Sequence, residues 1–94
     1  MRPFELVAIT PPFTAEPGVA LAASRAGGLG LLDLEHVHDP ELARRAVTRL
    51  AAGRPARTGL KLAARDAELV AELCRGLPAG CRTVVLTGLA TGAA

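Results

Sequence analysis

Short apolar runs alternate with amphipathic segments along the whole chain. Four runs are rich in strand-forming residues and stop at glycine, proline or polar residues, over residues 4–9, 29–34, 58–63 and 82–87. Between them, apolar residues recur at helical spacing over residues 19–26, 40–52 and 66–75. Strands that are apolar on both faces and joined by helical crossovers form parallel sheets. The pattern therefore predicts an α/β domain with the order βαβαβαβ.

The expected helix ends carry specific signals. Pro17 suits a first helical position, because its missing N–H costs nothing there, and Gly27-Gly28 should end the first helix with one glycine in a left-handed cap conformation. Asp39-Pro40-Glu41 combines an N-cap, a first-position proline and an acidic first turn. This triplet predicts the start of the second helix.

Each helix shows a stripe of apolar residues that we expect to face the sheet. The first stripe consists of small residues, which allow close packing: Val19, Ala22, Ala23 and Ala26. The second comprises Leu42, Ala46, Val47 and Leu50. The third comprises Leu69, Val70, Leu73 and Cys74. Arg44, Arg45 and Arg49 are expected on the solvated side of the second helix.

Four parallel strands form either a small open sheet or the first half of an eight-stranded barrel. The helix-to-strand connections are short, the units are nearly equal in length, and small residues from Gly88 to Ala94 follow the fourth strand instead of a helix. A complete (β/α)8 barrel takes roughly 250 residues, so 94 residues correspond to a little under half of one. We therefore predict that residues 1–94 are the N-terminal half of a TIM barrel.

Composition narrows the classes of partner. Half of the residues are hydrophobic and the mean hydropathy is +0.32, so the chain can bury a core. Only two aromatic residues, Phe4 and Phe13, and a net charge of +2 with scattered arginines argue against nucleic acid as a partner. No apolar run resembles a membrane span or a signal peptide. Two cysteines are too few for a disulfide scaffold, and we expect a cytoplasmic protein.

Lys61, the only lysine, lies between Leu60 and Leu62 in the third strand. Because side chains alternate along a strand, it should point to the face opposite those leucines, which in a barrel is the interior near the mouth. There its ammonium could pair with a carboxylate such as Asp33 or with an electron-rich cofactor edge. A desolvated lysine could instead act as a Schiff-base nucleophile, or the side chain could simply extend its charge to solvent.

The loop after the second strand offers a different chemistry. His36 and His38, with Asp33, Glu35 and Asp39, are metal-ligating residue types at the C-terminal end of a strand. The simpler interpretation is a solvated loop in which Asp39 caps a helix, and we assign no metal ligand.

Two further motifs have structural explanations. The glycines of residues 27–30 lie between a helix end and a strand start, the reverse of the order that a dinucleotide-binding fingerprint requires. Cys74 and Cys81 have no histidine nearby in sequence to act as a base, so we interpret them as a buried helix residue and a turn residue.

Residues 17–34, PGVALAASRAGGLGLLDL, resemble the opening of the nitronate monooxygenase (2-nitropropane dioxygenase-like) family of FMN-dependent TIM barrels. In that family an alanine-rich helix begins at a proline and ends in Ala-Gly-Gly-Leu-Gly, as residues 26–30 do here. The strand end Ile9-Thr10-Pro11 and the third strand TGLKL are similar as well, although Lys61 stands where the family has an asparagine. The opening FELV looks more like such domains at the front of polyketide-synthase-like proteins.

The resemblance implies FMN-dependent oxidation or reduction of a small organic substrate by the intact domain. Ile9, Thr10 and Pro11 would offer backbone contacts to the isoalloxazine ring, and Lys61 would lie at its polar edge. The family's catalytic histidine and phosphate-binding loops belong to the second half of the barrel, so we expect no activity from this chain alone and assign no catalytic residue.

Two other functions remain open. The first is a metal-dependent hydrolase-like barrel piece that uses Asp33, His36 and His38. The second is a non-enzymatic assembly module whose open strand edges pair with another chain or with the missing half-barrel.

Overall fold

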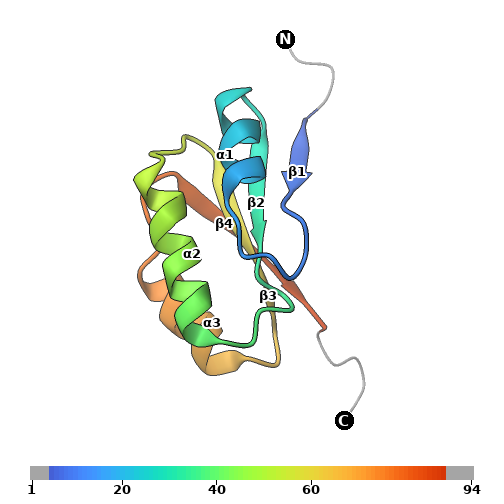
Figure 1. The fold of residues 1–94 in the computed structure, drawn as a ribbon, viewed down its shortest axis with the longest axis vertical. Helices are drawn as coiled ribbons and strands as arrows, with labels where there is room; N and C mark the ends of the chain where they lie inside the picture. Colours follow the sequence, from blue (N-terminus) through green and yellow to red (C-terminus); the bar gives the residue numbers. More distant parts are fainter. Residues whose placement is uncertain (1–4, 89–94) are drawn as a thin grey trace.

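The computed structural model describes residues 5–88 as one four-stranded parallel sheet with three helices (Figure 1). The elements follow one another as β1 (Val7–Ile9), α1 (Gly18–Arg25), β2 (Leu29–Asp33), α2 (Pro40–Ala52), β3 (Thr58–Ala63), α3 (Ala67–Arg75) and β4 (Cys81–Thr87). The strands lie side by side in sequence order, and each neighbouring pair is parallel. The predicted α/β class and the order βαβαβαβ are confirmed. Phe4 and residues 89–94 lie outside the described residues.

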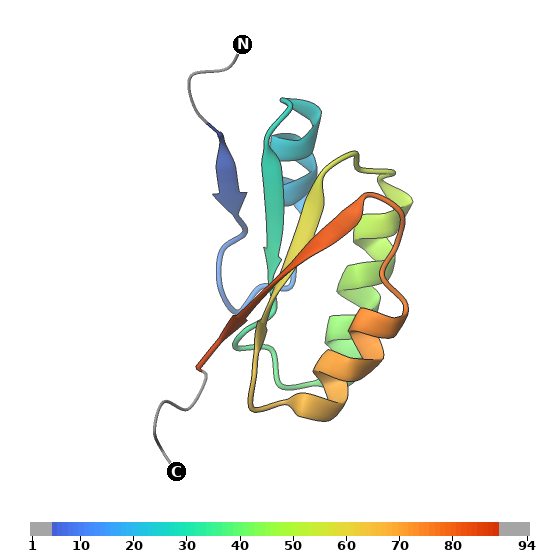
Figure 2. The same ribbon diagram turned by 180° about the vertical axis from the view of Figure 1, so that it is seen from behind.

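All three helices pack on the same face of the sheet (Figures 1 and 2). Leucines in or just after the two central strands meet small and aliphatic residues of the helices in a single core, which includes Leu32, Leu34, Leu60, Leu62, Ala20, Ala43, Ala46, Val47, Leu50 and Leu73. Burying each leucine stabilises the fold by about 1.5–3 kcal/mol. Because these residues come from α1, α2 and α3 alike, one layer of helices covers one side of the sheet.

The opposite side of the sheet, which we call the open face, carries no helix within residues 5–88 (Figure 2). Strand alternation and register assign its residues: Val7, Ile9, Leu29, Leu31, Asp33, Gly59, Lys61, Ala63, Thr83, Val85 and Thr87. Most of these side chains are apolar or small. The two charged residues among them, Asp33 and Lys61, lie toward the end of the face where the strands finish.

The signals at the end of α1 and the start of α2 act as predicted, whereas Pro17 is the N-cap before α1 and not its first residue. Gly27 has a φ of 87°, its N–H donates to the carbonyl of Ser24, and the N–H of Gly28 donates to the carbonyl of Ala23. These two bonds define a Schellman motif, which satisfies carbonyls left open at the helix end. The carboxylate of Asp39 accepts the N–H of Glu41 at 3.0 Å, which confirms its role as N-cap of α2.

The buried face of α1 differs from the predicted one. Ala20, Ala23 and Ser24 are buried, whereas Val19, Ala22 and Ala26 are exposed. The reason lies in the sheet: Gly30 has no side chain, and the backbone of Ala20 occupies the space where a Cβ would stand. The hydroxyl of Ser24 also accepts two backbone N–H groups of residues 56 and 57. Both contacts rotate the helix away from its most apolar side.

The other two helices need smaller corrections. In α2, Ala43 is buried in place of Leu42, which is exposed, while Ala46, Val47 and Leu50 are buried as predicted. In α3, Leu73 is buried and Leu69 and Val70 are partly buried.

Both predictions for the cysteines, a buried helix residue at Cys74 and a turn residue at Cys81, are wrong. Cys74 is exposed on α3, whereas Cys81 is buried at the start of β4 and belongs to the core. Thr58 pairs with Cys81 but the next residue, Gly59, pairs with Thr83, so Arg82 is an extra residue in β4. Such a bulge re-aims the flanking side chains, and Cys81 thereby turns toward the helices. Burial raises the pKa of its thiol.

We predict that Gly30→Ala lowers the free energy of unfolding by about 3 kcal/mol, because the added Cβ overlaps the carbonyl of Ala20 and must push α1 off the sheet. Gly76→Ala is the matched control, since a Cβ there meets no atom within 4 Å. Urea unfolding followed by circular dichroism measures both. Equal stabilities of the two variants would contradict the close packing of α1 on β2.

Candidate functional site

Polar side chains gather at the edge of the sheet where the four strands end. Thr10 follows β1, Asp33 ends β2, Glu35 comes two residues later, and Lys61 lies in the second half of β3. We call these four residues the edge cluster. The carboxyl ends of parallel strands share one edge, which is the usual place for ligand sites in α/β proteins.

The ammonium of Lys61 joins two carboxylates. Its Nζ lies 3.0 Å from Oε1 of Glu35 and 3.4 Å from Oδ2 of Asp33. Lys61 and Asp33 are direct partners in the register of β2 and β3. The predicted pairing with Asp33 is therefore confirmed. Glu35 is a second partner that the sequence analysis had grouped with the histidines.

Lys61 and Glu35 stabilise each other's ionised forms. Hydrogen bonding to Glu35 raises the pKa of Lys61 against the opposing effect of desolvation, and the charge of Asp33 adds to this. Lys61 in turn lowers the pKa of Glu35, with a smaller contribution from the hydroxyl of Thr87. A lysine that stays protonated has no free electron pair, so this arrangement disfavours the Schiff-base interpretation.

Asp33 is the buried anchor of the edge cluster, with its side chain only 5% exposed. Its Oδ1 accepts the N–H of Glu35 at 3.0 Å, which fixes the turn that brings Glu35 back toward Lys61. Its own N–H donates to the hydroxyl of Thr10 at 2.8 Å. Thr10 is itself 1% exposed. The ends of β1, β2 and β3 are thus tied together through Asp33.

The structure brings the residues predicted from the resemblance to the same edge as Lys61. Ile9 is on the open face and 48% exposed. The N–H of Thr10 donates to the carbonyl of Leu31 at 3.0 Å, and the carbonyl of Pro11 accepts the hydroxyl of Thr14 at 3.0 Å. The N–H of Thr10 is therefore engaged within the sheet. Contact of Ile9, Thr10 and Pro11 with a flavin stays a prediction.

The loop after β1 adds an aromatic side chain that the sequence analysis did not place. Phe13 stacks on His36, with ring centroids 4.8 Å apart and an interplanar angle of 25°. Phe13 has a φ of 71°, and Ala15, two residues later, has a φ of 52°. Positive φ is a strained conformation for side chains other than glycine, and such residues concentrate at functional sites. The Pro11-Pro12 pair before this loop is the only sequence signal for it.

The histidines are not arranged as metal ligands. His36 stacks on Phe13, His38 is exposed, and Asp33 faces Lys61. Within residues 5–88, no three side chains of histidine, cysteine, aspartate or glutamate come together in a way that could hold a metal ion. The hydrolase alternative based on Asp33, His36 and His38 therefore has no support from the geometry.

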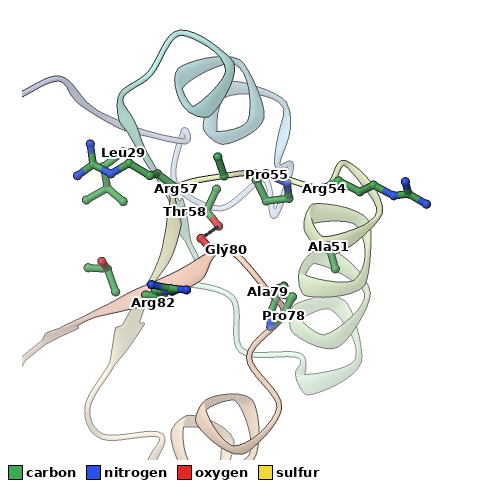
Figure 3. Close-up of a pocket in the computed structure, with 12 residues that line it drawn as sticks. Leu29, Ala51, Arg54, Pro55, Arg57, Thr58, Pro78, Ala79, Gly80 and Arg82 are labelled. Carbon is green, nitrogen blue, oxygen red and sulfur yellow. Dashed lines mark hydrogen bonds between the residues drawn. The ribbon is translucent and has the colours of Figure 1, made fainter.

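A hollow of about 610 Å³ lies at the opposite edge, where β2, β3 and β4 begin (Figure 3). Its lining includes Pro55, Thr58, Gly80 and three arginines, Arg54, Arg57 and Arg82. In Figure 3, Arg54 and Arg57 extend in opposite directions. Because these guanidinium groups do not converge, the hollow lacks the focused charge of an anion site. The edge cluster is the better candidate.

Comparison with known proteins does not identify a family for this chain. No family model, curated protein or solved structure matches the chain. Among the helices formed by residues 5–88, none has both the length and the apolar character needed to cross a membrane.

We predict that Thr10→Val lowers the free energy of unfolding by about 1–3 kcal/mol, because the buried N–H of Asp33 loses its acceptor without a change in side-chain shape. Thr48→Val is the control, since Thr48 is an exposed residue of α2. Urea unfolding measures both variants. If the Thr10→Val protein is as stable as the control, the hydrogen bond from Asp33 to Thr10 does not hold the edge cluster together.

We also predict that Lys61→Met raises the pKa of Glu35 toward 4.5, its ordinary value. In the wild type this pKa is depressed, so the ion pair stabilises the fold above pH 4.5 and the stabilisation is lost as the pH falls through the lower, folded-state pKa. Carboxyl ¹³C NMR titration measures the pKa directly. Arg65→Met, which removes a neighbouring exposed charge, should leave it unchanged.

Proposed function

We propose that this chain is the first half of a flavin-binding (β/α)8 barrel, resembling nitronate monooxygenases, that oxidises or reduces a small organic substrate when its second half is present. The open face of the sheet would be the barrel interior, and the edge cluster would lie at the barrel mouth. The observation that carries the proposal is the sheet order: four parallel strands in sequence order with all helices on one face.

Strand order separates a barrel from the main alternative. A doubly wound sheet reverses its strand order near the middle and carries helices on both faces. A (β/α)8 barrel adds each strand beside the previous one and keeps every helix outside. Residues 5–88 follow the second pattern in all three βαβ units. This supports the barrel, and it leaves the open face free to line an interior.

The open face next to the edge cluster fits the ring part of a flavin. Leu31 lies across Gly59, close to where a Cβ would stand, and its small exposed part, 5% of the residue, would form an apolar floor between Ile9 and Lys61. Ile9 borders this floor on β1 and the ammonium of Lys61 borders it on β3. A flat ring with a polar, electron-rich edge matches a floor of this kind. Bound FMN would supply reversible hydride and electron transfer.

The residues of the chain would position the ring and hold a positive charge beside it. Asp33 and Glu35 keep Lys61 protonated, and the buried carboxylate of Asp33 fixes where its ammonium lies. The ammonium has three N–H donors and two carboxylate partners, so it could donate its remaining hydrogen bond to an acceptor at the polar edge of the ring. Thr10 contributes indirectly, because its hydroxyl holds the backbone of Asp33.

We predict that the protein encoded by the complete reading frame around this chain retains FMN after incubation and desalting. Lys61→Met should weaken FMN binding roughly tenfold, since the interaction with a charged donor is lost. Arg65→Met should bind FMN like the wild type, because Arg65 is an exposed residue after β3. Retained flavin absorbance and fluorescence titration measure these effects.

Two results would contradict this proposal. Absence of retained flavin from the complete protein would reject the cofactor. Equal FMN affinities for Lys61→Met and Arg65→Met would reject the open face next to Lys61 as the place where the ring binds.

A further inference from the structure

Exposed apolar side chains concentrate at the two outer strands of the sheet. Large hydrophobic residues are exposed at seven positions within residues 5–88, and four of them belong to or directly precede β1 and β4: Leu6, Val7, Ile9 and Leu86. Soluble proteins normally protect edge strands with charge, proline or a covering element. Apolar edges of this kind are typical of strands that pair with another chain.

The backbone of β1 has hydrogen-bonding groups directed away from the sheet. The N–H of Leu29 donates to the carbonyl of Leu6, and the N–H of Thr10 donates to the carbonyl of Leu31. In a parallel ladder the N–H and C=O of one residue point to the same side, and alternate residues point to opposite sides. Val7 and Ile9 therefore direct their N–H and C=O groups to the outer edge of β1.

The same argument applies to β4. The N–H of Ala64 donates to the carbonyl of Thr87, so Thr87 and Val85 direct their backbone groups to β3. Val84 and Leu86 consequently direct theirs to the outer edge. Both edges of the sheet thus present a row of parallel-strand donors and acceptors.

We infer that two copies of this chain pair edge to edge, β4 of each copy against β1 of the other, and close an eight-stranded parallel barrel around a two-fold axis along the barrel. Each copy supplies both missing edges of the other, which makes the assembly closed. The open faces become the common interior, and Val7, Ile9 and Val85 leave the solvent. The inference rests on the barrel geometry of the proposed function but needs no flavin, and it concerns residues 1–94 by themselves, where a second copy takes the place of the second half.

Barrel geometry also fixes the register of the new pairing. In an eight-stranded barrel of this type the strand register shifts by about eight residues over one full circuit, a quantity called the shear. Each four-stranded half therefore accounts for a shift of about four residues. Ile9, Leu31, Gly59 and Thr83 are level across the sheet. With this offset, Thr83 pairs with the residue four positions before Ile9 in the second copy, which is Glu5. Val85 then lies opposite Val7, and Thr87 lies opposite Ile9. An offset in the other direction would carry β4 beyond β1 and leave the strands unpaired.

This register satisfies three requirements at once. Because the offset is even, Val7 and Val85 keep their side chains on the interior face. The outward backbone groups of Val84 and Leu86 come beside those of Val7. At the start of the seam, Arg82 of one copy comes near Glu5 of the other, whose carboxylate also pairs with Arg57 of its own copy at 2.8 Å.

The mass of the protein tests the pairing. Size-exclusion chromatography with light scattering should give a concentration-dependent dimer of twice 9.6 kDa. Val7→Lys should shift the protein to the monomer by at least tenfold in dissociation constant, because it places a charge in the interior. Val19→Lys is the matched control: Val19 is 44% exposed on α1, against 48% for Val7, and lies on the helix side. Circular dichroism verifies that both variants fold.

Disulfide cross-linking tests the register. In a Cys74→Ser background, Val7→Cys combined with Val85→Cys should form covalent dimers under mild oxidation. A disulfide within one copy is excluded, because β1 and β4 are three strand spacings or about 14 Å apart. Val19→Cys combined with Val85→Cys is the control and should give no covalent dimer above background.

Four results would overturn the inference. A strict monomer at high concentration, open-ended polymers, or a dimer insensitive to Val7→Lys would reject the closed pairing, and absence of the Val7–Val85 cross-link would reject its register. If the chain is monomeric while the complete protein retains FMN, a different segment supplies the second half, and the proposed function stands without the dimer.

Discussion

A strand that is apolar on both sides needs cover on both sides, and the remaining features of this protein depend on that constraint. Three helices cover one face of the sheet and bury leucines of β2 and β3 against small helix residues. The other face carries Val7 and Ile9, each 48% exposed, without a helix among the described residues to cover it. Burial of apolar surface is the dominant favourable term in folding. The exposed apolar side chains of this face favour a covering layer, which the barrel proposed above would supply by closing an interior.

The edge cluster shows how the same sheet tolerates charge. Asp33 is 4% exposed as a whole residue, and a carboxylate so buried is stable only with partners. Lys61 supplies the opposite charge, and the backbone N–H of Glu35 supplies a hydrogen bond. Because each group is satisfied by another at the strand ends, the cluster is rigid and charged at once. These are the properties that a ligand site at a barrel mouth requires.

Much of the fold was predictable because the signals for it are local. Asp39 and Gly27 act on backbone groups within a few residues, so cap chemistry alone located two helix ends correctly. Alternation along β3 likewise placed Lys61 opposite Leu60 and Leu62, and Asp33 was one of the two kinds of partner expected for it. Helix faces were less predictable: α1 turns its alanine backbone toward Gly30, a contact between residues that no periodicity within α1 encodes.

The sequence by itself determined the alternation of strands and helices, the parallel class of the sheet, and the presence of one lysine on the face away from the helices. Tertiary structure alone decided the second carboxylate beside Lys61, the burial of Cys81, and the stacking of Phe13 on His36. Each of these depends on a turn, a bulge or a strained loop that brings distant atoms together. Local propensity sets which element a segment forms, whereas contacts between elements set which side chains meet.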